Sequence, residues 1–409
     1  MNGTALLTDR YELTMLGSAL RDGTSERRCV FEVFARRLPD GRRYGVVAGT
    51  GRLLEVISDF RFDADTIEFL LAGDVVDDTT AEFLETYRFR GDLDGYPEGE
   101  LYFPYSPVVT ITGSFAEAVV LETLVLSVLN HDCAIASAAA RMVVAAGGRP
   151  LIEMGSRRTH EQAAVAAARA AYVAGFAATS NLSTSERYGV PTAGTAAHAF
   201  TLLHDDERAA FAAQVNALGA GTTLLVDTYD ITRGIARAVE VAGRELGAIR
   251  IDSGDLAVLA LHARQQLDTL GATGTRIVVS GDLDEYSIAA LAAAPVDVYG
   301  AGTAVVTGSG APTAQMVYKL VEVDGRPVAK RSESKESHGG RKTAVRMHKP
   351  TGTAVEEIVH VGAVADPLPE GQRRLQRPFL RAGEPVADLP TLDDARERVR
   401  AATVTLPWD

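Results

Sequence analysis

Cysteine is scarce in this sequence: Cys29 and Cys133 are the only two among 409 residues. Two distant cysteines make neither a disulfide framework nor a structural zinc site, and they suit a reducing compartment. Asp9, Arg10 and Glu12 interrupt the N-terminal region before an apolar run of signal-peptide length forms. No uncharged stretch is long enough to cross a bilayer. These absences predict a cytoplasmic protein.

Positive charge is also in deficit, with 41 basic against 54 acidic residues and a net charge of -13. This balance opposes non-specific binding to nucleic acid or to an anionic membrane, so we expect neither as a partner. A small anionic substrate stays compatible, because a pocket can be basic within an acidic molecule. Hydrophobic residues make up 46% and charged residues 23%, as in globular proteins, and the length favours a barrel-sized domain plus a smaller one.

Residues 114–323 alternate short apolar segments with helical, alanine-rich ones. This alternation predicts a parallel sheet, and the number of units favours a closed α/β barrel over the alternative, a doubly wound open sheet. The predicted strands are residues 151–155, 176–181, 222–228, 248–253, 276–281 and 296–300.

The flanking regions differ from this pattern. Residues 1–113 indicate a mixed α/β domain that opens with a helix, for which Asp9 and Glu12 have capping-box spacing, and that has hairpins over residues 91–113. Residues 324–409 are mixed β and loop in composition. They include the basic residues 330–349, most simply interpreted as a solvated surface loop or hairpin.

Polar residues of reactive type follow nearly every predicted strand of the middle region. In a parallel barrel these strand ends share one face, where active sites form. For any single Asp, Ser or Asn, the simpler interpretation is a helix N-cap. Arg250 is different, because it lies inside an apolar strand and needs an anionic partner, either a structural ion pair or a bound ligand. Gly281 and the turn at residues 300–303 come late in the series, where small-residue loops often hold phosphate.

His198 lies in GTAAHAF, residues 194–200, flanked by alanines. On a helical turn Thr195 and His198 would share one face. The imidazole can act as a base, a metal ligand or a phosphoryl acceptor, but no His, Cys or Glu stands nearby at ligand spacing. The alternative is a partly buried histidine with a purely structural role.

Taken together, the motifs resemble those of the nicotinate phosphoribosyltransferase family, in the same order along the chain. They run from the N-terminus to about residue 346, where KRSESKESHGGRKTAVR is similar to a basic family segment. The other blocks are LLTDRYELTM (6–15), FEVFARRLP (31–39), GTAAHAF (194–200), IRIDSGDL (249–256) and YGAGTAVVTGSGAPT (299–313).

The resemblance implies a type II phosphoribosyltransferase fold. An irregular α/β barrel, residues 114–323, would carry the active site, and an N-terminal α/β sandwich, residues 1–113, would be completed by residues 324–409. It also implies a homodimer with shared active sites. The implied reaction joins nicotinate to the ribose of phosphoribosyl pyrophosphate (PRPP), giving nicotinate mononucleotide and pyrophosphate for NAD salvage, with ATP hydrolysed alongside and Mg²⁺ required.

The resemblance also implies residue roles. His198 matches the histidine that becomes phosphorylated, and Tyr11, Thr195 and Arg250 match nicotinate-contacting positions. Thr303 matches a PRPP-phosphate contact, supported by backbone donors at Gly281 and Gly302. We further expect Asp252 and Asp282 to hold the ribose and Mg²⁺ and to favour positive charge on the anomeric carbon. Arg157 or Arg158 is expected to neutralise pyrophosphate or the substrate carboxylate, but EMGSRRTH at residues 153–160 departs from the usual family sequence, so the division between them stays open.

Three other functions are compatible with parts of this pattern. Nicotinamide phosphoribosyltransferase shares the fold and the histidine but takes a neutral substrate, which needs no cation for a carboxylate. Quinolinate phosphoribosyltransferase takes a dicarboxylate and needs a more basic pocket. A non-catalytic binder of pyridine nucleotides would keep the fold without turnover.

Overall fold

The computed structural model describes residues 4–330 and 337–407, and the chain divides into two compact units. One unit comprises Met1–Ser137 with Thr313–Asp409, and the other comprises Ala138–Pro312. These boundaries lie away from the expected ones at residues 113/114 and 323/324. The first of them falls inside the 25-residue helix α6, Glu122–Ala146, so the change in sequence composition near residue 114 precedes the boundary.

The unit Ala138–Pro312 is built on a six-stranded parallel sheet in the order β7-β6-β11-β10-β9-β8. Its strands are β6 (Leu151–Glu153), β7 (Ala178–Thr179), β8 (Thr223–Leu225), β9 (Ala248–Ile251), β10 (Arg276–Gly281) and β11 (Val298–Ala301). The last strand in sequence, β11, pairs with the first, β6, and each other strand pairs with its sequence neighbour except across β7 and β8. This is the cyclic order of a barrel interrupted once, between β7 and β8, so the closed barrel expected from the number of units is wrong. The predicted irregular α/β barrel is confirmed as a curled half-barrel, and the doubly wound alternative is rejected.

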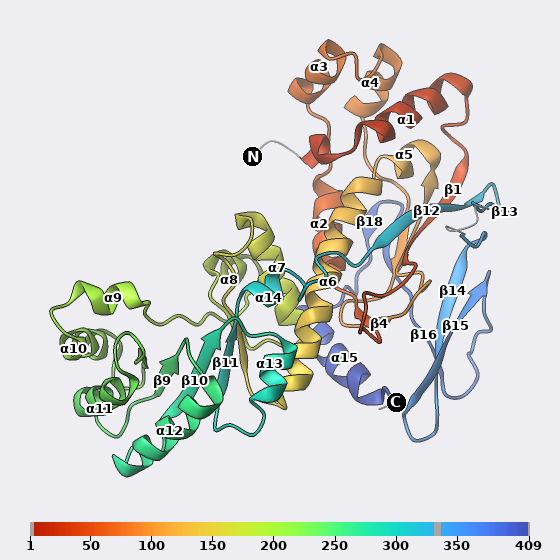
Figure 1. The fold of residues 1–409 in the computed structure, drawn as a ribbon. Helices are drawn as coiled ribbons and strands as arrows, with labels where there is room; N and C mark the ends of the chain where they lie inside the picture. Colours follow the sequence, from red (N-terminus) through yellow and green to blue (C-terminus); the bar gives the residue numbers. More distant parts are fainter. Residues whose placement is uncertain (1–3, 331–336, 408–409) are drawn as a thin grey trace. The chain divides into compact units, whose positions relative to one another are not determined.

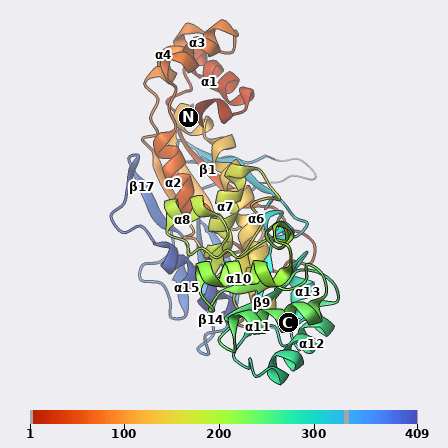
Figure 2. The same cartoon turned by 90° about the vertical axis from the view of Figure 1, so that its left-hand side faces the viewer.

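Helices follow the strands of this unit, and several begin at polar residues that the sequence places after strands. Figures 1 and 2 show α10 and α11 packed side by side. The side chains of Asn181, Asp230 and Asp255 accept hydrogen bonds from the first turns of α8, α11 and α12, so the simple capping interpretation holds for these three. The helices are α7 (Glu161–Val173), α8 (Leu182–Tyr188), α9 (His198–Leu203), α10 (Glu207–Leu218), α11 (Ile231–Ala242), α12 (Leu256–Thr269), α13 (Glu285–Ala290) and α14 (Thr303–Val306).

The other unit is an α/β sandwich whose main sheet has seven strands in the order β13-β12-β1-β5-β3-β17-β18, with antiparallel pairing throughout. Segments from both ends of the chain therefore complete one sheet, and its apolar face belongs to the main hydrophobic core. The strands are β1 (Arg28–Ala35), β3 (Asp92–Gly95), β5 (Val109–Ser114), β12 (Met316–Val323), β13 (Arg326–Pro327), β17 (Arg377–Arg381) and β18 (Glu384–Pro385).

Two smaller sheets and a set of helices complete this unit. The sheet β15-β14-β16 consists of β14 (Lys342–His348), β15 (Ala354–Val361) and β16 (Gln372–Arg374), and β2 (Gly45–Val46) pairs with β4 (Leu101–Tyr102). The helices are the 3-10 helix η1 (Thr4–Leu7), α1 (Arg10–Asp22), α2 (Thr50–Asp59), α3 (Ala64–Ala72), α4 (Asp78–Glu85), α5 (Phe115–Val119) and α15 (Leu392–Thr405).

The predicted capping box at the start of α1 is wrong, although the helix itself is present. Asp9 occupies the N-cap position but makes no side-chain cap hydrogen bond. Glu12 is fully buried and accepts hydrogen bonds from the Thr8 hydroxyl at 2.8 Å and from the Thr123 backbone N–H at 2.9 Å. A tertiary partner has replaced the local one, because a buried carboxylate must be hydrogen-bonded.

The sequence predicts a solvated surface loop or hairpin over residues 330–349, of which residues 331–336 lie outside the described residues. The hairpin is confirmed, because β14 pairs antiparallel with β15, the next strand in the sequence, but the expectation that the segment is solvated is wrong for β14. Residues 342–348 form β14, and two of its cations are buried. Lys342 Nζ lies 2.6 Å from Glu32 Oε2, and the Arg346 guanidinium lies 2.5 Å from Glu100 and 2.6 Å from Glu357. Carboxylates on β1, just before β4 and on the neighbouring strand β15 make this burial possible.

One helical stretch, Phe115–Ala146, is long and apolar enough to pass a length-and-composition test for a membrane span, and 67% of its most apolar window is buried within the protein. Such burial is typical of the core helix of a globular protein.

Candidate active site

A cavity of about 530 Å³ opens at the C-terminal ends of the half-barrel strands. It is the place where α/β barrels build their active sites. Eight of the predicted site residues line it: Arg157, Arg158, Arg250, Asp252, Gly281, Asp282, Gly302 and Thr303. The predicted residues therefore make up half of the lining, and they lie at or just after the ends of four different strands.

Arg250 is held in place by three polar neighbours. Its Nε donates to Ser280 Oγ at 2.7 Å, its NH2 lies 2.7 Å from Asp252 Oδ1, and its NH1 lies 3.4 Å from Thr195 Oγ1. The anionic partner that the apolar strand required is thus Asp252, in an internal ion pair. The side chain of Arg250 is 15% exposed and still borders the cavity, so its remaining N–H groups can meet a ligand.

Asp252 carries a stabilised negative charge. Burial acts to raise its pKa, but hydrogen bonds from Ser280 and Arg250, and the charge of Arg250, outweigh burial and hold the pKa of Asp252 below its usual range. Both hydrogen bonds go to Oδ1. Among the described residues Oδ2 has no hydrogen-bond partner, so it can accept from a ligand or bind a cation.

His198 begins α9, and its side chain is 41% exposed. The expected helical turn shared with Thr195 is wrong, because α9 begins at His198 and Thr195 precedes it outside any helix. Thr195 and His198 instead have different partners: Thr195 contacts Arg250, and His198 Nδ1 lies 3.1 Å from Thr228 Oγ1. The imidazole is accessible and is not enclosed by aliphatic side chains.

Asp227 is a site residue that the sequence did not single out from the other polar strand ends. Its carboxylate is 1% exposed, and Oδ2 accepts from the backbone N–H of Asp252 at 2.8 Å and from Ser253 Oγ at 3.2 Å. Within the described part of the chain Oδ1 has no hydrogen-bond partner, and it lies 3.8 Å from His198 Nε2. Asp227 thereby links the histidine to the cavity wall. The sequence pattern gave no reason to separate Asp227 from Asp230, three residues later. Both follow the same strand and could cap the next helix, and Asp230 is the residue that does so.

Arg157 and Arg158 line the cavity as exposed side chains, and within residues 4–330 and 337–407 neither guanidinium has an ion-pair or hydrogen-bond partner. The strand before them ends at Glu153, which is buried and accepts from Thr179 Oγ1 at 2.6 Å and from the backbone N–H of Gly155. Burial raises the pKa of Glu153 despite these hydrogen bonds. Two unpaired cations therefore face the cavity above a buried carboxyl group.

Glycines allow the loops to approach one another closely. Gly281 has a φ of +132°, and a Cβ there would lie 3.0 Å from the carbonyl oxygen of Asp252. A Cβ on Gly155 would lie 2.2 Å from Val306 Cγ1 and 2.9 Å from the carbonyl oxygen of Gly302. The backbone of these loops, with Gly302 and Thr303 at the start of α14, is thus exposed to a ligand without intervening side chains.

The predicted Mg²⁺ ligands, Asp252 and Asp282, both line the cavity. Among the described residues no group of three or more His, Cys, Asp or Glu side chains could hold a metal ion. Two carboxylates with open coordination positions nevertheless fit Mg²⁺, which is commonly bound by one or two carboxylates together with substrate phosphates and water.

Tyr11 belongs to the other unit. It lies on α1, is 45% exposed and interacts with Glu122. It is not among the residues that line the cavity.

Comparison with known proteins places the whole arrangement in one family. Residues 6–130 match the nicotinate phosphoribosyltransferase (NAPRTase) N-terminal domain. Nicotinate phosphoribosyltransferase pncB1 of Mycobacterium tuberculosis (strain ATCC 25618 / H37Rv) is 67% identical over 412 residues, which cover 99% of this chain and 91% of the relative. The nicotinate phosphoribosyltransferase of Bos taurus is 30% identical over 91% of this chain and 81% of its own length.

Solved structures agree. Human nicotinic acid phosphoribosyltransferase superposes with a TM-score of 0.84 at 26% identity and covers 98% of this chain and 94% of its own. Nicotinate-nucleotide pyrophosphorylase from Pyrococcus furiosus gives a TM-score of 0.82 at 25% identity, with 98% and 95% coverage. The chain, with its half-barrel cavity and its sandwich unit, therefore belongs to the nicotinate phosphoribosyltransferase family.

Proposed function

We propose that this chain transfers the phosphoribosyl group of PRPP to nicotinate, giving nicotinate mononucleotide and pyrophosphate for NAD salvage, and that ATP hydrolysis is coupled to this reaction through phosphorylation of His198. The observation that carries the proposal is the convergence of Arg250, Asp252, the arginine pair and the glycine loops on one cavity, with His198 joined to it through Asp227.

Arg250 would bind the nicotinate carboxylate. It is a fixed, partly exposed guanidinium at the cavity wall, and a planar fork of N–H groups suits a carboxylate. Thr195, 3.4 Å from the same guanidinium, would add a hydroxyl contact to the substrate. The neutral amide of nicotinamide would gain less from this cation, which favours nicotinate over nicotinamide.

PRPP would lie across the remaining wall. Gly281, Gly302 and Thr303 would offer backbone N–H groups to its phosphate, and Arg157 and Arg158 would neutralise its pyrophosphate. Nucleophilic attack by the pyridine nitrogen forms the bond to the anomeric carbon while the bond from that carbon to pyrophosphate breaks. Asp252 and Asp282 would favour the positive charge that develops there, and the same carboxylates would hold Mg²⁺, which neutralises the leaving pyrophosphate when bound.

His198 would accept the γ-phosphoryl group of ATP, with ADP as the leaving group. Asp227 Oδ1 faces Nε2 and favours a proton on that nitrogen, which leaves the lone pair on Nδ1. Nδ1 is the nitrogen that lies beside the Thr228 hydroxyl. The phosphohistidine would add negative charge next to the PRPP site and order its loops through charge-assisted hydrogen bonds, so ATP would improve PRPP affinity.

The assembly and location belong to the same proposal. We infer a cytoplasmic homodimer in which Tyr11 of the partner subunit supplies an aromatic surface for the nicotinate ring. Both cysteines are buried and unpaired, which fits a reducing compartment.

Product formation from PRPP tests the proposal, with nicotinate or nicotinamide as acceptor and with or without ATP. We expect mononucleotide from nicotinate, stimulation by ATP, and far slower turnover of nicotinamide. In His198→Asn the stimulation should vanish while basal transfer remains. Equal ATP stimulation of both proteins would reject the role of His198, and product binding without turnover of any substrate would reject catalysis.

A further inference from the structure

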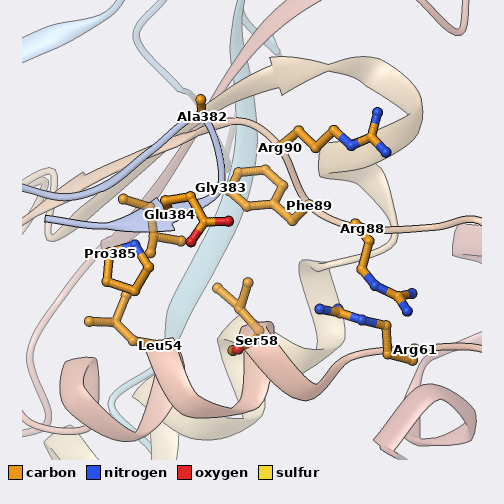
Figure 3. Close-up of a pocket in the computed structure, with 12 residues that line it drawn as sticks. Leu54, Ser58, Arg61, Arg88, Phe89, Arg90, Ala382, Gly383, Glu384 and Pro385 are labelled. Carbon is orange, nitrogen blue, oxygen red and sulfur yellow. The ribbon is translucent and has the colours of Figure 1, made fainter.

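The sandwich unit contains a second cavity, of about 440 Å³. None of the residues that line it was assigned a role in the reaction proposed above. Figure 3 shows its walls: helix α2 below, the segment Arg88–Arg90 on one side, and the β17–β18 turn on the other. Its charged lining residues are Arg61, Arg88, Arg90 and Glu384, a formal balance of three cations and one anion. This surplus is notable in a chain with thirteen more acidic than basic residues.

Arg61 and Arg88 line the same end of the cavity, and the charge of Arg88 acts on Arg61. Arg61 NH1 donates to the carbonyl oxygen of Phe60 at 2.7 Å, and Arg88 NH1 donates to that of Tyr87 at 2.6 Å. Figure 3 shows their guanidinium groups side by side, with Arg90 directed away from the pair. In the part of the chain that the structure describes, none of the three forms a salt bridge. Burial and then the charge of Arg88 lower the pKa of Arg61, and the charge of Asp59 opposes this shift.

The opposite wall is a tight turn between β17 and β18 that places one carboxylate at the cavity. Ala382 and Gly383 have φ values of +49° and +81°, and the Gly383 N–H donates to the Gly91 carbonyl oxygen at 2.8 Å. A Cβ on Gly383 would lie 2.3 Å from the carbonyl oxygen of Phe89, so only glycine allows this approach. The turn thereby fixes Glu384 over the cavity, facing the arginine pair across it.

The remaining lining is largely apolar. Leu54, Ile57, Leu380 and Pro385 form a surface on which a hydrocarbon or aromatic group can pack, and Ser58 contributes a hydroxyl. A cavity with a few convergent polar groups and an apolar floor has the general character of a small-molecule site.

We propose that this cavity binds a small organic phosphate, with the phosphate between Arg61 and Arg88 and an apolar or aromatic portion against Leu54 and Pro385. A phosphate monoester carries about −1.5 to −2 charges near neutral pH, which matches the surplus of two cations. Guanidinium pairs bind phosphate through parallel charge-assisted hydrogen bonds, and a phosphate between these two would replace their repulsion by attraction. This site does not depend on the reaction proposed above.

Calorimetric titration of the full-length protein with phenyl phosphate, and separately with inorganic phosphate, tests the site. We expect phenyl phosphate to bind more tightly than inorganic phosphate because of the apolar floor. In the variant R61Q/R88Q the affinity of this cavity for phenyl phosphate should fall at least about tenfold, because each charged hydrogen bond contributes a factor of about ten. Phosphate binding at the half-barrel cavity should remain in this variant.

The matched control is R208Q/R400Q, which removes the same charge from two exposed ion pairs. It should bind phenyl phosphate as the native protein does. E384Q should bind it more tightly, because it removes a negative charge from the cavity. Unchanged binding in R61Q/R88Q, an equal loss in the control, or no gain in E384Q would each overturn the proposal. If R61Q/R88Q does not fold, E384Q alone decides the question.

Discussion

Asp227 Oδ1 lies 3.8 Å from His198 Nε2, and it is a buried carboxylate oxygen without a hydrogen-bond partner among the residues that the structure describes. Its other oxygen is engaged by the Asp252 backbone. An unpartnered buried acceptor costs stability, and the His198 imidazole is positioned to interact with this one.

The variant Asp227→Asn should separate the stability cost of the buried carboxylate from its effect on the His198 imidazole. The amide keeps an acceptor for the Asp252 N–H but removes the charge that favours a proton on Nε2. We expect ATP-dependent phosphorylation of His198 to fall at least about tenfold, while thermal stability is unchanged or higher. Phosphohistidine formation and Tm are the measurements. Asp205→Asn, an exposed position, is the control; native phosphorylation in Asp227→Asn would contradict the role.

Arg250→Lys should weaken recognition of nicotinate. The lysine keeps the charge but loses the fork that contacts Ser280, Asp252 and the substrate carboxylate. We expect kcat/KM for nicotinate to fall by about ten- to a hundredfold, or about 1.5–3 kcal/mol, and the preference over nicotinamide to shrink. Steady-state kinetics with both acceptors measure this. Arg276→Lys, at the exposed opposite end of the neighbouring strand, should have native kinetics. Retained selectivity in Arg250→Lys would exclude Arg250 as the carboxylate contact.

Gly281→Ala should strain the cavity wall. A side chain at a φ of +132° is disfavoured, and the added Cβ would press on the Asp252 carbonyl oxygen. We expect a loss of about 1–3 kcal/mol in the free energy of unfolding together with reduced affinity for PRPP. Chemical denaturation and PRPP titration report the two effects. Gly274→Ala, which meets no atom within 4 Å, should be tolerated; equal behaviour of the two variants would argue against strain.

Glu153→Gln should alter how stability depends on pH. Because burial raises the folded-state pKa of Glu153, the folded protein holds its proton more tightly than the unfolded chain does. Native stability should therefore fall, relative to Glu153→Gln, as pH rises from the ordinary glutamate value of about 4.3 through the raised folded value. The glutamine amide can still accept from Gly155 and donate to Thr179. Denaturation at several pH values measures the difference; a constant offset would contradict the linkage.

Arg346→Gln should destabilise the sandwich unit. Arg346 is 3% exposed and pairs with Glu100 and Glu357, so its loss leaves Glu357 buried without its cation. We expect a loss of about 3–5 kcal/mol in the free energy of unfolding. Arg400→Gln breaks an exposed pair with Glu397 and should change stability little. Equal stability of the two variants would show that the buried network contributes nothing.

The sequence alone determined the alternation of strands and helices, the position of the cavity at the strand ends, and half of its lining. These features depend on local patterns: apolar periodicity marks a strand, and the residues that follow it must lie at its carboxyl end. Arg250 could be identified as a candidate because a single cation inside a short apolar strand is recognised from the local sequence alone.

Only the tertiary structure decided which carboxylate partners which group. Asp227 and Asp230 follow the same strand, yet one faces His198 and the other caps α11, and nothing local distinguishes them. Likewise Glu12 turned from a capping position to Thr123, and Lys342 and Arg346 became buried through Glu32 and Glu100, which lie 310 and 246 residues away. The energy of an ion pair or buried hydrogen bond depends on distance in space, so partners brought together by folding are absent from the local pattern.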